Sequence, residues 1–395
     1  MKNLLAATTA LTLAGGAALA QDSTVKIGVI LGYTGPIESL AGSMAQGAEL
    51  AIAEVNDAGG ILDGTMVEAV RADTGCIDNG LATSNTERLL EEGIAGIVGG
   101  DCSGVTGAML QNVAIPNGMV MISPSATSPA LSTVEDNGLF YRTAPSDARE
   151  GEIMAEILME RGFESVALTY TNNDYGKGLA DAFQAAYEAA GGQVTISTAH
   201  EDGRADYSAE VAELDAAGGD ILVVAGYLDQ GGLGIIRSSL DAGSFDQFVL
   251  PGGMVGDSLA ENIGADIEGS FGQIAGSGNE GAQTLAGLAE AEGFDGTSPY
   301  TPESYDAAAI LMLAMAAAGS ADPASYNAEI LNVANAPGEP ILPGQLARAL
   351  ELIAAGEDID YVGGSDVELV GPGEAAGSYR EVEIQDGAFA TIGYR

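Results

Sequence analysis

The sequence contains few of the side chains that most catalytic and metal sites use. Its 395 residues include one histidine, His200, two cysteines, Cys76 and Cys102, and no tryptophan. The cysteines lack C-x-x-C spacing, so the usual zinc ligand sets are missing. A Ser-His-Asp arrangement would depend on a histidine at the end of a predicted strand, and no other feature supports one. We therefore predict a protein that is not an enzyme and that has no metal or cofactor.

Basic residues are also scarce. The chain has 13 Lys and Arg against 57 Asp and Glu, a formal net charge of −44. A nucleic-acid-binding protein must neutralise phosphates, and an anionic membrane surface also attracts basic segments. The charge therefore argues against both partners and predicts a solvated acidic surface.

Long apolar runs are rare. Residues 1–20 carry one cation, Lys2, then an apolar run that ends in Ala18-Leu19-Ala20, a pattern typical of a secretory signal peptide. We predict export with cleavage after Ala20. The alternative of a membrane anchor is disfavoured because the run contains Thr and Gly and is barely long enough to span. An exported chain with two cysteines favours one disulfide, and the shorter run from Ala307 to Gly319 predicts a buried helix.

Short β-branched runs alternate with longer helical patterns along the chain. The runs "VKIGVIL" (25–31), "IAGIVGG" (94–100) and "MVMISP" (119–124) are separated by helical stretches, and the alternation restarts after "FYRTAP" (140–145). This order predicts parallel sheets with right-handed crossovers. The roughly 375 residues after Ala20 exceed what one core usually serves, so we expect two α/β domains.

The loops after the predicted strands hold hydroxyl, small and aromatic residues and few charges. Ligands bind at the carboxyl ends of the strands in open α/β sheets. The hydroxyl-rich stretch "ISPSATSPALS" (122–132) has no His or Lys beside it, and Ser103 in "GGDCSG" lacks the glycine that a nucleophile elbow needs at position 101. These hydroxyls therefore predict a cradle for a small molecule, not a nucleophile.

Four stretches together resemble the periplasmic leucine/isoleucine/valine-binding proteins and the wider group of type I solute-binding proteins of ABC transporters. The stretch "IGVILGYTGPIESLAGSMAQGAELAIAEVNDAGGI" is similar to that family's first strand, loop and first helix. Cys76 and Cys102 resemble its early disulfide, and "ISPSATSPALS" resembles its S-P-x-A-T loop. The stretch "NNDYGKGLADAFQAAYEAAGG" resembles the start of a helix in its second lobe. The resemblance covers essentially the whole chain after residue 20.

The resemblance implies the type I periplasmic binding protein fold, in which two Rossmann-like lobes with parallel sheets are joined by a three-strand hinge and close on a ligand. We expect residues 1–20 to be the signal peptide. Residues 22–143 and 272–358 are expected to form lobe 1, and residues 144–271 and 359–395 lobe 2. The implied protein is a periplasmic monomer that carries a small-molecule ligand to the membrane permease of an ABC transporter.

The resemblance also implies a ligand site between the lobes. In lobe 1, hydroxyls and main-chain groups hold the ligand's carboxylate and ammonium, and the matching residues here are Ser103, Ser125, Ala126 and Thr127. Aromatic residues of lobe 2 fold over the ligand, and Tyr175 and Tyr227 match them. One residue of the first helix faces the ligand's side chain, and Leu40 matches it.

One position departs from the family pattern. Relatives that bind α-amino acids carry a Glu in the loop that resembles "PGGMVG", and here Gly253 occupies that position. An ammonium group buried without a counter-charge is unfavourable, so Asp229 or Asp257 would have to substitute. We predict a branched-chain or related amino acid as the ligand. An amide or a short-chain or aromatic carboxylate is one alternative, and a ligand-sensing module of the same fold is the other.

Overall fold

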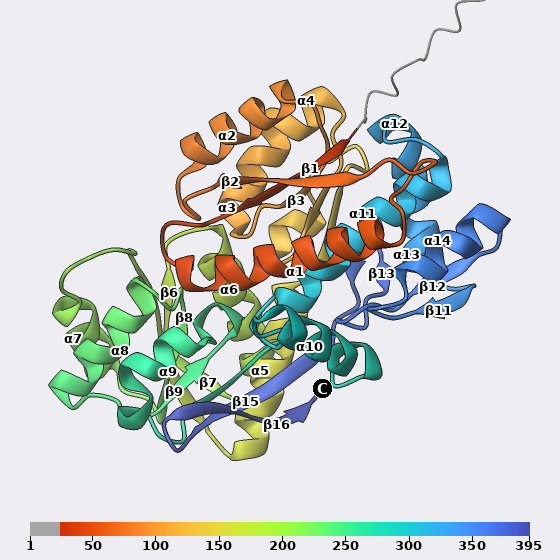
Figure 1. The fold of residues 1–395 in the computed structure, drawn as a ribbon. Coiled ribbons are helices and arrows are strands. Elements are labelled where there is room, and N and C mark those ends of the chain that lie inside the picture. The colour runs from red at the N-terminus through yellow and green to blue at the C-terminus, as the bar shows by residue number, and fades with distance from the viewer. Residues whose placement is uncertain (1–23) are drawn as a thin grey trace, which may run out of the picture.

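The computed structural model describes residues 24–395, and these residues form two seven-stranded sheets with helices packed around each (Figure 1). The predicted signal peptide and its cleavage site after Ala20 lie outside the described residues. Two mostly parallel α/β sheets connected by crossing segments are the predicted fold class, which the structure confirms.

The first sheet has the strand order β13-β14-β5-β4-β3-β1-β2. All neighbours are parallel except the pair β13–β14. Its strands are β1 (Val25–Leu31), β2 (Val67–Asp73), β3 (Ile94–Gly99), β4 (Met121–Ser123), β5 (Phe140–Pro145), β13 (Leu369–Val370) and β14 (Glu374–Ala375). The helical segments between β1 and β5 are α1 (Glu38–Asp57), α2 (Asn79–Glu91), α3 (Ser103–Met109), the π-helical η1 (Leu110–Ala114), α4 (Ile115–Asn117) and η2 (Pro129–Ser132).

The second sheet has the order β16-β15-β10-β9-β8-β6-β7, with antiparallel strands at the β15–β16 edge. Its strands are β6 (Ser165–Thr171), β7 (Gln193–His200), β8 (Ile221–Ala225), β9 (Phe248–Leu250), β10 (Phe271–Ala275), β15 (Tyr379–Gln385) and β16 (Ala388–Tyr394). The helical segments of this part are α5 (Asp147–Arg161), α6 (Asp174–Ala189), α7 (Ser208–Ala217), α8 (Gly231–Ala242), η3 (Gly252–Met254), α9 (Asp257–Ile263) and η4 (Gly264–Asp266).

The remaining elements lie between β10 and β13 in the chain and include the long helix α11. They are α10 (Glu280–Glu292), α11 (Thr301–Ala318), α12 (Pro323–Tyr326), η5 (Asn327–Glu329), α13 (Ile330–Ala334), β11 (Glu339–Ile341), α14 (Leu346–Ala355) and β12 (Ile359–Tyr361). Strands β11 and β12 form a separate two-stranded parallel sheet.

Helix α11 is the buried helix that the apolar run predicted. Almost all of its residues are buried, and it packs against α1 and the first sheet. The two helices approach closely at Gly47, where an added Cβ would lie 2.5 Å from the carbonyl oxygen of Thr301. Within residues 24–395 no single helix is long and apolar enough to cross a membrane, although α11 and the segment Pro323–Ala334, bent by 89°, pass that test as a pair.

Local capping places two helices that matter for the site. Helix α6 starts after Asn173, whose side chain accepts hydrogen bonds from the N–H groups of Tyr175 and Gly176 (both 3.1 Å). Helix α5 starts after Ser146, whose hydroxyl accepts from Ala148 N–H (3.3 Å). Asn and Ser are strong helix starters because they satisfy N–H groups that lack a partner within the helix. The caps fix the start of α6 at Asp174, next to Tyr175, and the start of α5 at Asp147.

The chain crosses between the sheets three times: after β5, between β10 and α11, and between β14 and β15. Within the segment 359–395, which we expected in lobe 2, β13 and β14 pair with the first sheet while β15 and β16 pair with the second. The third crossing therefore follows β14, because β14 extends the edge beside β5 before the chain leaves. The lobe boundaries stay a prediction. Below, lobe 1 means the first sheet and the helices on it, α11 included, and lobe 2 means the second sheet with its helices.

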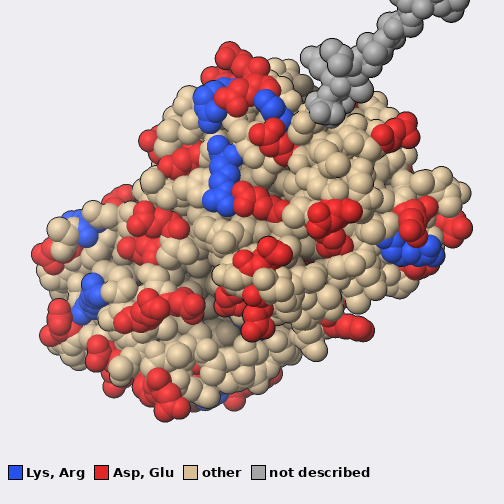
Figure 2. All heavy atoms as spheres, in the orientation of Figure 1, with Lys and Arg blue, Asp and Glu red and all other residues tan. Residues whose placement is uncertain are grey.

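Acidic side chains are spread over the face of the molecule in Figure 2, and basic side chains are few there. Most of the basic residues are held in ion pairs, such as Arg71 with Glu49 (2.6 Å) and Arg348 with Glu339 (2.9 Å). The surface therefore has the solvated acidic character expected from the composition.

Candidate functional site

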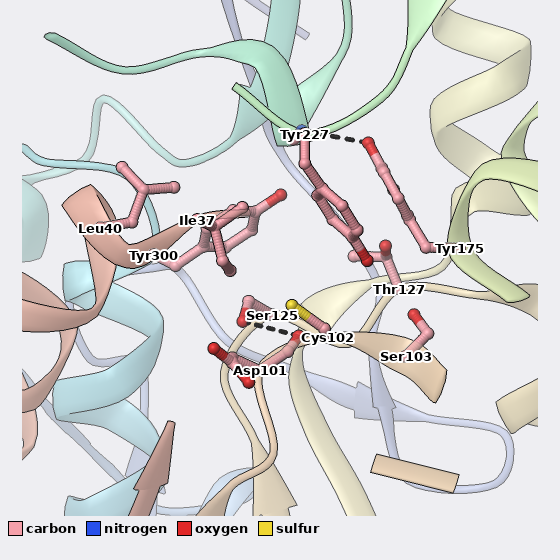
Figure 3. A pocket seen from close by; sticks show the side chains of 11 residues that line it. Ile37, Leu40, Asp101, Cys102, Ser103, Ser125, Thr127, Tyr175, Tyr227 and Tyr300 are labelled. Carbon is pink, nitrogen blue, oxygen red and sulfur yellow. Dashed lines mark hydrogen bonds between the residues drawn. The ribbon is translucent and has the colours of Figure 1, made fainter. Parts of the chain in front are cut away.

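A cavity lies between the lobes, where loops that follow the carboxyl ends of both sheets face each other (Figure 3). The space in it that can hold the centre of a water molecule is only about 20 Å³, so the two walls lie close together. Of the eight predicted ligand residues, six line it: Leu40, Ser103, Ser125, Thr127, Tyr175 and Tyr227. The other lining residues are Ile37, Asp101, Cys102, Gly253 and Tyr300.

The wall from lobe 1 carries hydroxyl groups that are already fixed in place. Ser123 organises the loop after β4, since its Oγ accepts hydrogen bonds from the N–H groups of Ser125 (3.4 Å) and Ala126 (2.9 Å). Ser125 Oγ donates to the carbonyl oxygen of Asp101 (3.0 Å). Ser103 Oγ accepts from Ser128 N–H (3.1 Å), so its own proton can be donated to a ligand.

Arg142 holds the same loop from behind. Its side chain is 1% exposed, and one guanidinium nitrogen donates to the carbonyl oxygens of Ala126 (3.1 Å) and Ser128 (3.0 Å). The other nitrogen forms an ion pair with Glu374 and donates to Ser132 Oγ (2.6 Å). A loop held this way loses little conformational freedom when a ligand binds.

The predicted disulfide between Cys76 and Cys102 is present and joins the loops that follow β2 and β3. Asp101 lies beside it, buried, and its carboxylate accepts from Gly32 N–H (2.5 Å) and Thr74 Oγ1 (3.0 Å). Burial raises the pKa of Asp101 above its ordinary value, and these hydrogen bonds oppose the shift. Asp101 therefore ties three strand-end loops together at the cavity.

The wall from lobe 2 consists of aromatic rings over a glycine. The rings of Tyr175 and Tyr227 are stacked with centroids 5.0 Å apart, and both are buried. Gly253 N–H donates to Tyr175 Oη (3.1 Å), and a Cβ added at Gly253 would lie 2.7 Å from that oxygen. Burial raises the pKa of both Tyr175 and Tyr227 well above the ordinary value, so both rings keep their hydroxyl protons.

The sequence did not identify Tyr300 as a site residue, although it completes the cover. It is buried, precedes α11, and adopts a left-handed backbone with φ of 59°. That conformation is uncommon for a side chain other than Gly, Asn or Asp. Ile37 was also missed. The only sequence signal was position, since each residue lies directly before a long helix that the sequence does indicate.

Two predicted ligand residues lie outside the cavity wall. The carbonyl oxygen of Ala126 accepts from Arg142, and its N–H is bonded to Ser123. The carboxylate of Asp229 accepts from Ser39 N–H (2.9 Å) and Ser258 Oγ (2.7 Å), so it links lobe 2 to the start of α1.

The cavity shows no arrangement for catalysis. His200 lies at the end of β7, where its Nδ1 is 2.9 Å from Thr169 Oγ1, and it is not among the lining residues. Burial lowers the pKa of His200 to about 4, so the ring is neutral. Within the part of the chain that the structure describes, no three His, Cys, Asp or Glu side chains are grouped to hold a metal ion.

Comparisons with known proteins agree with this geometry. Residues 24–347 match the family described as "Periplasmic binding protein". The Leu/Ile/Val-binding protein homolog 1 of Brucella melitensis is 32% identical over 315 residues, which cover 78% of this chain and 82% of the relative.

Two solved structures share the fold over 94% of this chain. The branched-chain amino acid transporter substrate binding protein LivJ of Streptococcus pneumoniae, in complex with isoleucine, is 20% identical with a TM-score of 0.78 and is covered over 99% of its length. A solute binding protein of an ABC transporter from R. palustris, in complex with benzoate, is 18% identical with a TM-score of 0.74 and is covered over 96%. The family resemblance stated from the sequence is confirmed.

Proposed function

The chain belongs to the periplasmic binding protein family, and on that premise we propose that it binds a branched-chain or related amino acid between its lobes. As a member of this family it is a solute-binding protein of ABC transport and not an enzyme. The bound solute would stabilise the closed lobes, and the closed form would deliver it to a membrane permease. The predicted signal peptide supports a periplasmic location, and the protein acts as a monomer in this proposal.

The observation that carries the proposal is the pairing of two unlike walls in one cavity. The hydroxyls of Ser103 and Thr127 can donate to a carboxylate, and charge-assisted hydrogen bonds of this kind are short and strong. The rings of Tyr175 and Tyr227 cover the other side with apolar surface. None of the lining residues is basic. This combination fits a small solute with one carboxylate and an apolar side chain.

A second candidate is an aromatic carboxylate. It is supported by Gly253, which places no acidic side chain against an ammonium, and by the likeness to a protein whose structure contains benzoate. Stacked tyrosines can cover a flat ring as well as a branched side chain.

A thermal-shift panel separates the two candidates. The protein is unfolded, dialysed and refolded to remove copurified solute, and its melting temperature is then measured with leucine, isoleucine, valine, benzoate and 4-hydroxybenzoate. A ligand that binds only the folded state stabilises it by about 2.7 kcal/mol at 100 times its dissociation constant. We expect the branched-chain amino acids to raise the melting temperature most. A shift with the benzoates alone would favour the second candidate, and no shift with any compound would contradict the proposed function.

A further inference from the structure

We propose that a second cavity, beside the crossing from β10 to α11, binds a small organic carboxylate whose charged group is held by Arg380. The second cavity is separate from the cavity between the lobes, and the inference does not depend on the proposed function.

The second cavity lies between α10 and the β15–β16 edge of the second sheet, where these elements are neighbours in space (Figure 1). Its lining residues include Ser277, Gln283, Pro299, Arg380 and Tyr394. The space in it that can hold the centre of a water molecule is about 170 Å³, against about 20 Å³ in the cavity between the lobes. The second cavity therefore has room for several water molecules or for a small organic molecule.

The charge of this wall is the reverse of the charge of the chain. None of the residues that line the second cavity is acidic, and one, Arg380, is basic. The chain as a whole has 57 Asp and Glu against 13 Lys and Arg. Within residues 24–395, Arg380 is one of three basic residues without an ion pair, and the others are Lys26 and Arg237. A cavity with an unneutralised guanidinium and no acid in its wall favours an anion.

The guanidinium of Arg380 also has donors that no group of the protein uses. In the described part of the chain its side chain donates one hydrogen bond, from Nη1 to the carbonyl oxygen of Thr297 (3.2 Å). Its Nε is buried and has no hydrogen-bond partner among the same residues. Buried donors are almost always paired, so this nitrogen indicates a partner from outside the chain. A carboxylate fits best, because it can accept from Nε and from a terminal nitrogen at once in a bidentate pair.

The acids near Arg380 are engaged elsewhere. Burial raises the pKa of Glu303 to about 8, and the charge of Arg380 opposes this shift. Glu303 therefore keeps its proton at neutral pH and does not neutralise Arg380. Asp257 and Asp295 line an adjoining cavity together with Arg380. The carboxylate of Asp295 accepts from the N–H and the hydroxyl of Thr297 (both 2.8 Å), so it is held by its own loop.

The rest of the wall suits an apolar body. Tyr394 pairs directly with Arg380 across β15 and β16, so both side chains lie on the same face of the sheet. A Cβ added at Gly278 would lie 2.8 Å from the ring of Tyr394, so this ring packs over the loop after β10. Tyr394 is 53% exposed, which leaves this side of the second cavity open to solvent. The other apolar lining residues include Ala275, Ala282, Ala286, Pro299 and Pro302.

Tyr300 lines both the second cavity and the cavity between the lobes. Its hydroxyl lies on the side of lobe 2, since a Cβ added at Gly252 would be 2.5 Å from that oxygen. The two cavities are thus neighbours that share one wall residue. A carboxylate probe could enter either of them, so the test fills the cavity between the lobes first.

The probe is 4-fluorobenzoate, observed by fluorine NMR in the presence of excess leucine, which occupies the cavity between the lobes in the proposed function. We expect the probe signal to broaden when wild-type protein is added. The uncharged 4-fluorobenzamide has nearly the same shape and should show no broadening, because it cannot form the charged pair with Arg380.

Arg380→Gln removes the charge and should weaken the probe by about 10-fold or more, as expected for a lost charge-assisted hydrogen bond. Tyr394→Ala removes a half-exposed ring and should weaken the probe by about threefold to 10-fold. Arg237→Gln is the matched control. Arg237 also lacks an ion pair, but it is exposed on α8 and donates to Asn262 Oδ1 (3.0 Å). Its replacement should leave probe binding unchanged.

The outcomes separate this inference from the proposed function. No broadening by the wild type, equal broadening of the benzamide, or binding that persists in Arg380→Gln would overturn the inference alone. Displacement of the probe by an equal concentration of phosphate would also overturn it, because the second cavity would then select any anion. If Arg380→Gln does not fold, Tyr394→Ala decides in the same way. If no compound of the thermal-shift panel binds, the proposed function fails, but probe binding that depends on Arg380 still supports the second cavity.

Discussion

Lobe 1 contributes the serine and threonine hydroxyls of the cavity, together with Ile37 and Leu40, whereas lobe 2 contributes the stacked rings of Tyr175 and Tyr227. The hydroxyls of Ser103 and Ser125 are fixed by hydrogen bonds inside lobe 1, and the loop that carries Ser125 is anchored by Arg142. The rings of Tyr175 and Tyr227 are held by each other and by one hydrogen bond from Gly253. In the proposed function, polar recognition would therefore be organised before the lobes close, and closure would add the apolar cover.

The lobes also differ in what they bury. Lobe 1 buries four charged residues: Asp101, Arg142, Glu303 and Asp306. Lobe 2 buries His200, which is neutral, and two acids, Asp147 and Glu150, on the first turn of α5. Arg142 is the buried basic residue among these, and it is ion-paired, so removing its charge should have a larger effect than changing a ring hydroxyl of lobe 2.

The largest effect is expected for Arg142→Met, which keeps the volume of the side chain but removes its charge. The carbonyl oxygen of Ala126 would lose its donor, while Glu374 would keep only Ser132 Oγ and the carbonyl oxygen of Ser128 only Leu131 N–H. Breaking a buried ion pair costs about 3–5 kcal/mol, so urea unfolding should show a loss of this size. Leucine affinity should fall as well. If the variant were as stable as the wild type, Arg142 would not be the anchor of the loop after β4.

The next effect concerns pH. Burial raises the pKa of Glu303 to about 8, above its ordinary value of 4.5. The folded state therefore holds a proton that the unfolded state has lost, and this residue's contribution makes the folded state less stable as pH rises from about 5 to 8. Glu303→Gln has no carboxyl group to titrate at this position and should not lose stability in this way. The difference in free energy of unfolding between Glu303→Gln and the wild type should therefore grow in favour of the variant by up to about 4 kcal/mol from pH 5 to pH 8, measured by urea unfolding at each pH. Parallel curves for the two proteins would contradict the assignment.

A direct comparison of hydroxyls from the two walls is expected to give an intermediate effect. Ser103→Ala and Thr127→Ala should each weaken leucine by about 10-fold, because each removes a donor to the carboxylate. Tyr227→Phe keeps the ring and should change affinity less than about threefold. Calorimetric titration measures all three. Equal losses in both walls would show that the division between hydroxyls and rings does not describe binding.

The smallest effect is expected for Asp229→Asn at the contact between the lobes. Asp229 accepts from Ser39 and Ser258 and is only partly buried, so water screens part of the interaction. We expect about a two- to threefold faster release of leucine in stopped-flow measurements, with the association rate unchanged. Ser258→Ala removes one of the same bonds and should act in the same direction. A loss as large as that of Ser103→Ala would place Asp229 with the ligand residues instead.

Local patterns predicted the parts of the site that lie at the ends of strands and at helix starts. Ser103 and Tyr175 were identified because each belongs to a motif whose neighbours in sequence are also its neighbours in space. Arg142, which anchors the loop after β4, was not identified, because its ion-pair partner Glu374 is 232 residues away in the sequence. Asp229 was predicted as a possible partner for an ammonium, but its carboxylate accepts a hydrogen bond from Ser39 N–H at the start of α1, 190 residues earlier in the sequence.

Cys102 is at once half of the disulfide and part of the cavity wall. The redox state of the compartment in which the chain folds therefore helps to shape the surface that meets the solute. A preparation made under reducing conditions carries two thiols at that wall, and its loop after β3 is no longer tied to the loop after β2. Binding measured on such a sample describes a different surface from the oxidised protein, so thiol counts belong beside every affinity that is compared between preparations.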